Sequence, residues 1–412
     1  MIVDTGGVAH GGAVIAHDDQ GRTLLVHHAL PQERVLAEPG LRRAGVVHAD
    51  AIEILTPSAD RVPAPCPHFG VCGGCSWQHA RYPAQLELKL QVVTDAWRRA
   101  GLRLPPGTTI AGMDNPWRYR IRGEFEAIGE GGEIEFGFHR ARSHRAFSIT
   151  TCPLHDERIE RALFAFRDAL RESGVRGVVN LLLSVEPTGH GLLWRLRRRG
   201  PVDAQQQLDL AGRVAERLPD LVLLDDSMSL EFFGLTFRVR SDTFIQTNYE
   251  QMLVLYRTAL GMLGARPQER ILDLYAGIGT LALSVAQAAA RVTAVEENPA
   301  AAQLSLLSAR INAVKNFNAL PGRVESVLKG VRLGSYEAAL IDPPRAGCER
   351  AAIAELIRLG LERLVYVSCE PSTHARDLAL LVQGGYRVRR AALVDMFPQT
   401  YHIETVALLE RA

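Results

Sequence analysis

The sequence predicts an α/β protein in which a doubly wound α/β domain follows two β-rich regions. From about residue 236, apolar runs of strand length alternate with helical segments of ten or more residues, which is typical of a parallel sheet with helices on both faces. The first 56 residues instead contain several short strands, and three closely spaced cysteines follow them. We therefore expect domains at residues 1–56, 57–235 and 236–412.

The composition is that of an ordinary soluble globular protein, with 47% hydrophobic and 23% charged residues in a chain of 412. No apolar run reaches the roughly 18 residues that a membrane span needs, and the N-terminus lacks a signal peptide. We expect a cytoplasmic protein. A net charge of +1 excludes a global basic field as a sign of nucleic-acid binding. Six cysteines in a reducing compartment favour metal binding or catalysis over disulfides.

Residues 1–56 read as a small β-barrel. Strand-like runs at residues 11–16, 22–26, 34–38 and 51–55 are separated by Gly, Asp and Pro. Small barrels often bind oligonucleotides, although a purely structural role fits the pattern equally well. Because the barrel starts almost at Met1, we expect a short first strand and a reduced contribution to RNA binding.

The densest signal in the N-terminal half is a group of cysteines. Cys66, Cys72 and Cys75 lie on a Gly-rich loop, and Cys152, which is followed by Pro153, comes after a long gap. Three thiolates on one loop and a distant fourth beside a proline are a common way to hold a [4Fe–4S] cluster. Zinc is the alternative, but tetrathiolate zinc sites usually consist of two short-spaced cysteine pairs. The spacing favours the cluster.

The central region is expected to be mixed. We predict helices at residues 86–97, 157–172 and 206–217, and strands at 119–122, 133–138 and 178–185. Aromatic residues alternate with positive charge between residues 117 and 150, which suits either a strand surface that binds RNA or a solvated face. The arginines concerned are Arg118, Arg120, Arg122, Arg140, Arg142 and Arg145.

The C-terminal region carries the residues suited to catalysis. We expect strands at residues 270–275, 292–296, 338–341, 364–369, 387–394 and 404–409, and helices at 281–290, 300–312 and 372–383 and after residue 349. The strand at 364–369 ends on Cys369 and is followed at once by Glu370 and Pro371, so the thiol lies at a carboxyl end of the sheet. Open α/β sheets bind their ligands there.

A glycine turn indicates a nucleotide cofactor. Gly277 and Gly279 allow a ligand to approach the backbone, and Glu296 at the end of the next strand can accept hydrogen bonds from ribose hydroxyls. The complete GxGxxG fingerprint is absent, which argues against NAD or FAD. Asp-Leu-Tyr-x-Gly-x-Gly resembles the cofactor loop of S-adenosylmethionine-dependent methyltransferases. Asp342-Pro-Pro-Arg345 forms a rigid turn at another strand end, similar in part to the Asp-Pro-Pro-Tyr loop of amino-methyltransferases.

Taken together, these motifs closely resemble the RNA uracil-5 methyltransferase family. The likeness includes Ser-Cys369-x-Pro and Asp342-Pro-Pro-Arg, and it extends through residues 244–248, 273–279, 375–377, 395–398 and 402–409. It implies a Rossmann-like methyltransferase domain, and it identifies residues 1–56 with the family's TRAM barrel. The four cysteines match the family's iron–sulfur ligands and point to its rRNA-directed branch, because tRNA-directed members typically lack them.

The resemblance also implies roles for individual residues. Cys369 would attack carbon 6 of uracil, which makes carbon 5 nucleophilic enough to accept a methyl group from S-adenosylmethionine. Glu404 would then remove the proton from carbon 5. Asn248 and Arg345 would shape the pocket. The implied cofactor contacts are Gln246, Tyr275, Gly277, Gly279, Glu296 and Asp342.

We therefore expect a monomeric enzyme, without an obligate protein partner or a membrane, that methylates carbon 5 of an unstacked or flipped uridine in 23S rRNA. One alternative is methylation of uridine 54 in tRNA. Another is a non-catalytic RNA-binding or assembly factor, against which the presence of both Cys369 and Glu404 argues.

Overall fold

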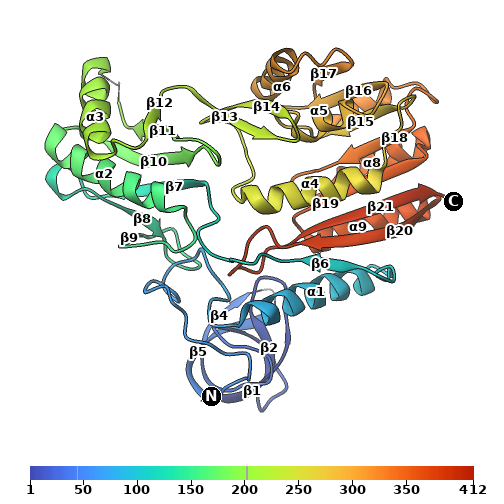
Figure 1. The fold of residues 1–412 in the computed structure, drawn as a ribbon. Helices are drawn as coiled ribbons and strands as arrows, with labels where there is room; N and C mark the ends of the chain where they lie inside the picture. Colours follow the sequence, from blue (N-terminus) through green and yellow to red (C-terminus); the bar gives the residue numbers. More distant parts are fainter. Residues whose placement is uncertain (44, 201–202) are drawn as a thin grey trace.

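The N-terminal strands close into a five-stranded barrel in the order β1-β2-β3-β5-β4. The computed structural model describes residues 1–43, 45–200 and 203–412, and the barrel lies at one end of the molecule (Figure 1). The predicted barrel is confirmed, but its first strand was not predicted at its true position and is longer than expected. The strands are β1 (Ile2–Val8), β2 (Val14–His17), β3 (Thr23–His27), β4 (Arg34–Arg43) and β5 (Val46–Thr56).

The central region contains a six-stranded sheet in the order β12-β11-β10-β7-β8-β9, against which α2 and α3 pack. Asp156 and Asp203 begin the two helices by accepting hydrogen bonds from backbone N–H groups. The strand expected at residues 119–122 begins only at Arg122. The elements are β7 (Arg122–Ile128), β8 (Glu135–His139), β9 (Ala146–Ser148), α2 (Glu157–Ser173), β10 (Val178–Val185), β11 (Gly191–Arg198), α3 (Ala204–Arg217) and β12 (Val222–Leu224).

The C-terminal region is built on an eight-stranded sheet in the order β17-β16-β15-β18-β19-β21-β20-β6. β15 to β19 are parallel, but β21 runs antiparallel to both β19 and β20, so the sheet is mixed and not wholly parallel as expected. The strands are β15 (Arg270–Leu274), β16 (Arg291–Glu296), β17 (Phe317–Pro321), β18 (Ala338–Ile341), β19 (Arg363–Ser368), β20 (Tyr386–Val394) and β21 (Glu404–Arg411).

Helices cover both faces of this sheet, as the alternating pattern predicted. Neighbouring residues of one strand point to opposite faces, so Leu340 packs in the core beneath α4, α5 and α6, whereas Ile341 packs beneath α7, α8 and α9. The helices are α4 (Tyr249–Leu263), α5 (Thr280–Ala286), α6 (Pro299–Ile311), α7 (Val324–Lys329), α8 (Arg350–Leu359) and α9 (Pro371–Gln383).

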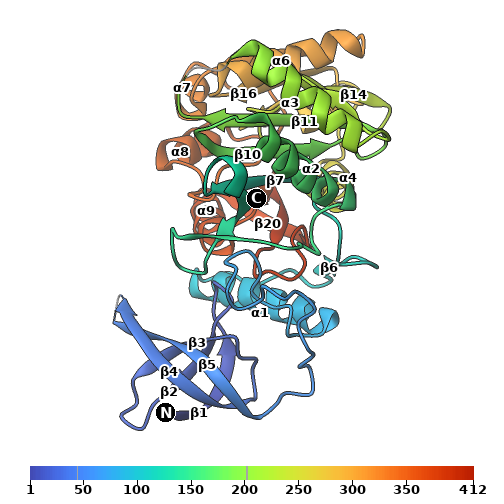
Figure 2. The same ribbon diagram turned by 90° about the vertical axis from the view of Figure 1, so that its left-hand side faces the viewer.

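Two segments of the central region belong in space to this C-terminal sheet. Helix α1 (Tyr82–Arg99) packs against α9, and β6 (Thr109–Ala111) pairs with β20 at the edge of the sheet. The hairpin of β13 (Ser227–Phe232) and β14 (Leu235–Arg240) spans the limit expected at residues 235 and 236. Figure 2 shows α1 lying between the barrel and the rest of the molecule. Within the residues described, none of the helices combines the length and apolar character required to cross a bilayer.

Candidate functional site

Cys369 and Glu404 face each other where β19 ends and β21 begins. Ser368 and Thr405 are paired in the antiparallel register of these strands, so the next opposed positions are those of Cys369 and Glu404. The Glu404 side chain is buried, with 4% of its surface exposed, whereas Cys369 is half-buried. A thiol and a carboxyl group therefore share one end of the sheet, as the sequence predicted for Cys369.

Two further carboxyl groups lie on the same face of the sheet. By strand alternation, Asp273 near the end of β15 and Asp342 directly after β18 point toward the α4 side, as do Cys369 and Glu404. Asp273 is fully buried, and its Oδ2 has no hydrogen-bond partner among the described residues. Asp273 belongs to the glycine-turn motif, but nothing in the sequence around it indicates a role of its own.

Burial controls the protonation of this cluster. It raises the pKa of Asp342 to about 7, and burial together with the Asp342 charge raises the pKa of Glu404 well above its usual range. Burial and the nearby Glu404 also raise the pKa of Cys369 to about 12, whereas the Arg345 guanidinium acts in the opposite direction. In the absence of ligands, the thiol is therefore protonated at neutral pH.

A buried histidine holds the two strand ends together. The Thr405 hydroxyl lies 2.7 Å from His374 Nδ1 and donates to the Ser368 carbonyl over 3.2 Å. The Thr405 hydroxyl thus contacts the last residue of β19 and the His374 ring at once. This network lies directly behind Cys369 and Glu404 and restricts their separation.

The glycine turn has the geometry of a ligand site. Glu296 at the end of β16 accepts hydrogen bonds from the backbone N–H of Gly277 over 2.7 Å and of Asn298 over 2.7 Å. A Cβ at Gly277 would meet no atom within 4 Å, so open space adjoins the turn there. Gly279, with φ +79°, packs tightly, because a Cβ would lie 2.7 Å from Ser305 Cβ. Gly277 thus leaves room for a ligand, and Gly279 permits the turn to pack closely against Ser305 of α6.

The remaining residues predicted to bind the cofactor or shape the pocket lie on different faces of the eight-stranded sheet. Gln246 is buried in the segment that leads to α4, and Asn248 caps this helix and donates to the Met396 carbonyl over 3.1 Å. Tyr275, with φ 63°, instead packs beside Cys348 in the core beneath α7, α8 and α9. Its ring therefore lies on the face opposite Asp273, with only its backbone in the glycine turn.

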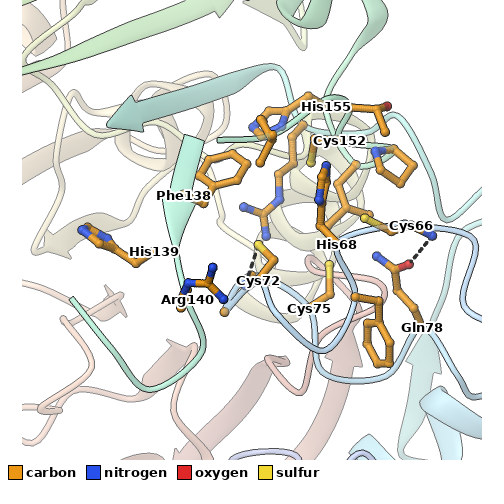
Figure 3. Close-up of a pocket in the computed structure, with 18 of the residues that line it drawn as sticks. Cys66, His68, Cys72, Cys75, Gln78, Phe138, His139, Arg140, Cys152 and His155 are labelled. Atoms are coloured by element: carbon orange, nitrogen blue, oxygen red, sulfur yellow. Dashed lines mark hydrogen bonds between the residues drawn. The ribbon is translucent and has the colours of Figure 1, made fainter. Parts of the chain in front are cut away.

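All four predicted ligand cysteines line one cavity of about 640 Å³. Figure 3 shows the sulfur atoms of Cys66, Cys72, Cys75 and Cys152 gathered around a common space. Burial raises the pKa of Cys75 to about 12, an effect that the positive charge of Arg120 opposes, and burial also raises the pKa of Cys72 and Cys152. No Asp or Glu of the described residues lines this cavity.

The four cysteines are not arranged as a site for a single metal ion in the part of the chain that the structure describes. Across residues 1–43, 45–200 and 203–412, no group of three or more His, Cys, Asp or Glu side chains is arranged so that it could hold a metal ion. A tetrahedral zinc site with Zn–S bonds of about 2.3 Å would bring its sulfur atoms within roughly 4 Å of one another. In a cubane cluster each thiolate binds a different iron, so the sulfur atoms lie farther apart.

Most of the arginines expected on an RNA-binding strand surface have partners in the protein. Arg118 pairs with Glu160 over 2.8 Å, Arg142 pairs with Asp50 of the barrel over 2.7 Å, and Arg122 donates to backbone carbonyls before α4. Arg120 lines the cysteine cavity. Arg118, Arg120 and Arg122 therefore contact neighbouring segments of the protein, whereas Arg142 remains exposed beside Asp50. Arg140 and Arg145 are exposed.

The barrel also reaches the candidate active site, which the sequence did not predict. His10 Nε2, in the turn between β1 and β2, lies 3.4 Å from Glu370 Oε1, directly after Cys369. Its ring makes an edge contact with Tyr401, which in turn packs on His402 at 4.1 Å between ring centres. The turn is anchored because Trp77 donates to the Gly12 carbonyl over 2.9 Å.

Comparison with known proteins identifies the family. The family described as tRNA (uracil-5-)-methyltransferase matches residues 205–412. A protein of Halalkalibacterium halodurans described as an uncharacterized RNA methyltransferase is 32% identical over 98% of this chain and 95% of its own length. The 23S rRNA (uracil(1939)-C(5))-methyltransferase of Chromohalobacter salexigens is 33% identical over 98% of this chain and 88% of its own length. The chain belongs to the RNA (uracil-5-)-methyltransferase family.

The fold of this RNA (uracil-5-)-methyltransferase matches a solved structure over its whole length. The structure is that of the tRNA (uracil-54, C5)-methyltransferase of Pyrococcus abyssi in complex with S-adenosyl-L-homocysteine. The match covers 99% of this chain and 100% of the Pyrococcus abyssi chain, with a TM-score of 0.75. At 20% identity this likeness shows the fold alone. The α/β S-adenosylmethionine methyltransferase fold with an N-terminal barrel, which the resemblance implied, is thus confirmed. The protein methylates carbon 5 of uracil in RNA and uses S-adenosylmethionine.

Proposed function

We propose that this RNA (uracil-5-)-methyltransferase modifies a uridine of 23S rRNA, with Cys369 as the nucleophile, Glu404 as the general base and a [4Fe–4S] cluster in the cysteine cavity. The observation that carries the catalytic assignment is the opposition of Cys369 and Glu404 across β19 and β21. The rRNA assignment is supported by the Chromohalobacter salexigens relative, which matches nearly the whole chain. The barrel is proposed to be the family's TRAM domain.

The cavity suits an anionic iron–sulfur cluster. Its four thiols surround a common space, and three cysteines on one loop with a distant fourth beside a proline favour a cubane over zinc. The cavity contains cationic and neutral side chains and no described carboxylate, so its charge fits an occupant with net negative charge. Cys66, Cys72, Cys75 and Cys152 would be the ligands.

The mechanism begins with Cys369. Its proton must pass to a neighbouring carboxylate, because burial makes the thiol a weak acid. The thiolate then attacks C6 of uracil, and the π electrons of the C5–C6 double bond move toward C5 and the O4 carbonyl to form an enolate. S-adenosylmethionine, when bound, supplies the methyl group that C5 accepts.

Glu404 completes the reaction. Its carboxylate removes the proton from C5, the electrons of that C–H bond restore the C5–C6 double bond, and the Sγ–C6 bond breaks to release Cys369 as a thiolate. The raised pKa of Glu404 makes its ionised form a strong base. Asp342, the segment from Gln246 to Asn248 and Arg345 are proposed to line the pocket around the uracil and the cofactor.

The glycine turn and the acidic end of β16 are proposed to hold the cofactor. Glu296 already orients the Gly277 amide and retains acceptor capacity for ribose hydroxyls. Gly277 borders open space, which suits close approach of a ligand to the backbone. For Tyr275 the support is weaker, because its ring packs on the other face and only its backbone adjoins the turn.

The test is transfer of labelled methyl from S-adenosylmethionine to unmethylated 23S rRNA and, in parallel, to unmethylated tRNA, with the nucleosides then separated. We expect label in 5-methyluridine of the rRNA, and none with Cys369→Ala. Label confined to tRNA would overturn the rRNA assignment while preserving the chemistry. That second candidate is favoured by the description of the matching family, which names tRNA.

A further inference from the structure

Arg120 occupies an unusual position in the central region. Its side chain lines the cysteine cavity, and its Nε is buried without a hydrogen-bond partner in the described part of the chain. A buried guanidinium N–H without an acceptor costs free energy, because it has lost water without gaining a partner inside the protein. The neighbouring Arg118 and Arg122 instead donate to protein oxygens.

The missing acceptor for Arg120 Nε is not a carboxylate of the cavity. No Asp or Glu lines the cavity in residues 1–43, 45–200 and 203–412, whereas four cysteines do. Arg120 shares the cavity with all four of these thiols. Binding of a metal would convert them to thiolates, whose sulfur atoms can accept hydrogen bonds from Arg120.

We propose that Arg120 is the counter-ion of the metal–thiolate group in the cysteine cavity, to whose sulfur atoms its guanidinium donates. This inference rests on the proposed metal-binding function of the cavity. A cubane core with four thiolates and a zinc ion with four thiolates are both dianionic, so the role of Arg120 does not depend on which metal is bound. Charge compensation by a fixed cation slows the loss of such a group from a partly apolar cavity.

The backbone of Arg120 connects this cavity to the substrate side. Its N–H donates to the Leu154 carbonyl over 2.8 Å, just after Cys152, and it forms an isolated bridge with Asn248 before α4. The next residue, Ile121, donates to the Thr247 carbonyl over 2.8 Å. The residue that faces the cysteines therefore also borders the segment that contains Gln246.

The experiment compares three variants of the full chain, each loaded with metal under anaerobic conditions. Arg120→Gln removes the charge, Arg120→Lys retains it, and Arg140→Gln removes an exposed arginine of the same cavity as a matched control. Release of metal to a coloured chelator is followed over time. We expect at least tenfold faster release from Arg120→Gln, and rates within about threefold of the unchanged protein for the other two.

If Arg120→Gln released the metal at the rate of the unchanged protein, the proposal would be overturned. It would also be overturned if Arg120→Lys released the metal as fast as Arg120→Gln, because the shape of the arginine and not its charge would then retain the metal. If Arg120→Gln does not fold, the rate of metal release from Arg120→Lys is used instead, and release at least tenfold faster than from the unchanged protein would overturn the proposal. Iron and sulfide content of the unchanged protein tests the cluster separately: zinc would overturn the cluster but not the counter-ion, and failure to bind either metal would overturn both.

Discussion

Lys89 of α1 and Asp395, which follows β20, form an ion pair of 2.5 Å in which neither side chain is exposed. Lys89 also donates to the Phe397 carbonyl over 3.0 Å, and the Tyr82 hydroxyl donates to Asp395 over 3.0 Å. The pair therefore anchors the loop of residues 395–403 that leads into Glu404. It connects a helix of the central region with the loop before the proposed base.

Removing Lys89 alone should strongly destabilise the protein. In Lys89→Met the Asp395 carboxylate remains buried without its cation, and such losses cost about 3–5 kcal/mol. Urea unfolding measures the change in free energy. The double variant Lys89→Met with Asp395→Asn removes both charges and should recover part of the loss. A single variant within 1 kcal/mol of the unchanged protein would contradict the importance of this pair.

Variants of the two proposed catalytic residues should block the reaction at different steps. Cys369→Ala cannot attack uracil and should form no covalent complex with RNA. Glu404→Gln retains the nucleophile but lacks the base, so the methylated adduct should accumulate because its C5 proton is not removed. A denaturing gel with labelled RNA and S-adenosylmethionine separates adduct from free RNA. Normal turnover by Glu404→Gln would exclude Glu404 as the base.

Cofactor affinity should depend on pH through Asp342. Burial raises its pKa to about 7, so its carboxyl is increasingly protonated as the pH falls below 7. The cationic sulfonium of S-adenosylmethionine favours the ionised form, and binding must then release a proton. Affinity should therefore weaken as the pH falls from 8 to 6, by at most about tenfold per pH unit.

Calorimetry in two buffers of different ionisation enthalpy detects this proton release. Asp342→Asn should bind the cofactor more weakly at pH 8 and lose most of the pH dependence. Glu296→Gln, which alters a carboxylate on another strand, should weaken binding but retain the pH dependence. Equal proton release by the unchanged protein and Asp342→Asn would assign the titration to another group.

Removal of the metal should weaken the binding of RNA more than the binding of the cofactor. The turn after Cys152 is hydrogen-bonded to Arg120, and the neighbouring Ile121 is bonded to Thr247 beside Gln246. Of the proposed cofactor contacts only Gln246 adjoins this connection, whereas the glycine turn follows β15 and Glu296 ends β16. We therefore expect a lower Tm and a higher KM for RNA, with little change in the affinity for S-adenosylmethionine.

Cys152→Ser should reproduce this effect of metal removal, whereas His139→Ala, which changes an exposed residue of the cavity, should not. Thermal unfolding and steady-state kinetics provide the two measurements. An unchanged Tm after complete metal removal would contradict a stabilising role, because a group that binds only the folded state must raise its stability.

Local sequence patterns determined most of the architecture. Cys369 was predicted at a strand end because an apolar β-branched run stops there before a proline, and β19 does end at Ser368. The run at residues 178–185 was predicted without error, since a segment of strand length in which six of eight residues are apolar is bounded by breaks. The four cysteines were grouped by their spacing, and they line one cavity. Each of these features depends on neighbours close in the sequence.

Other features were decided only by the tertiary structure. Glu404 faces Cys369 because β21 inserts antiparallel between β19 and β20, and His10 meets Glu370 because the barrel turn docks beside the loop of residues 395–403. Arg120 turns into the cysteine cavity although its sequence context resembles a solvated strand. Packing of chain segments hundreds of residues apart decides which polar groups meet, and periodicity along the chain carries no information about that choice.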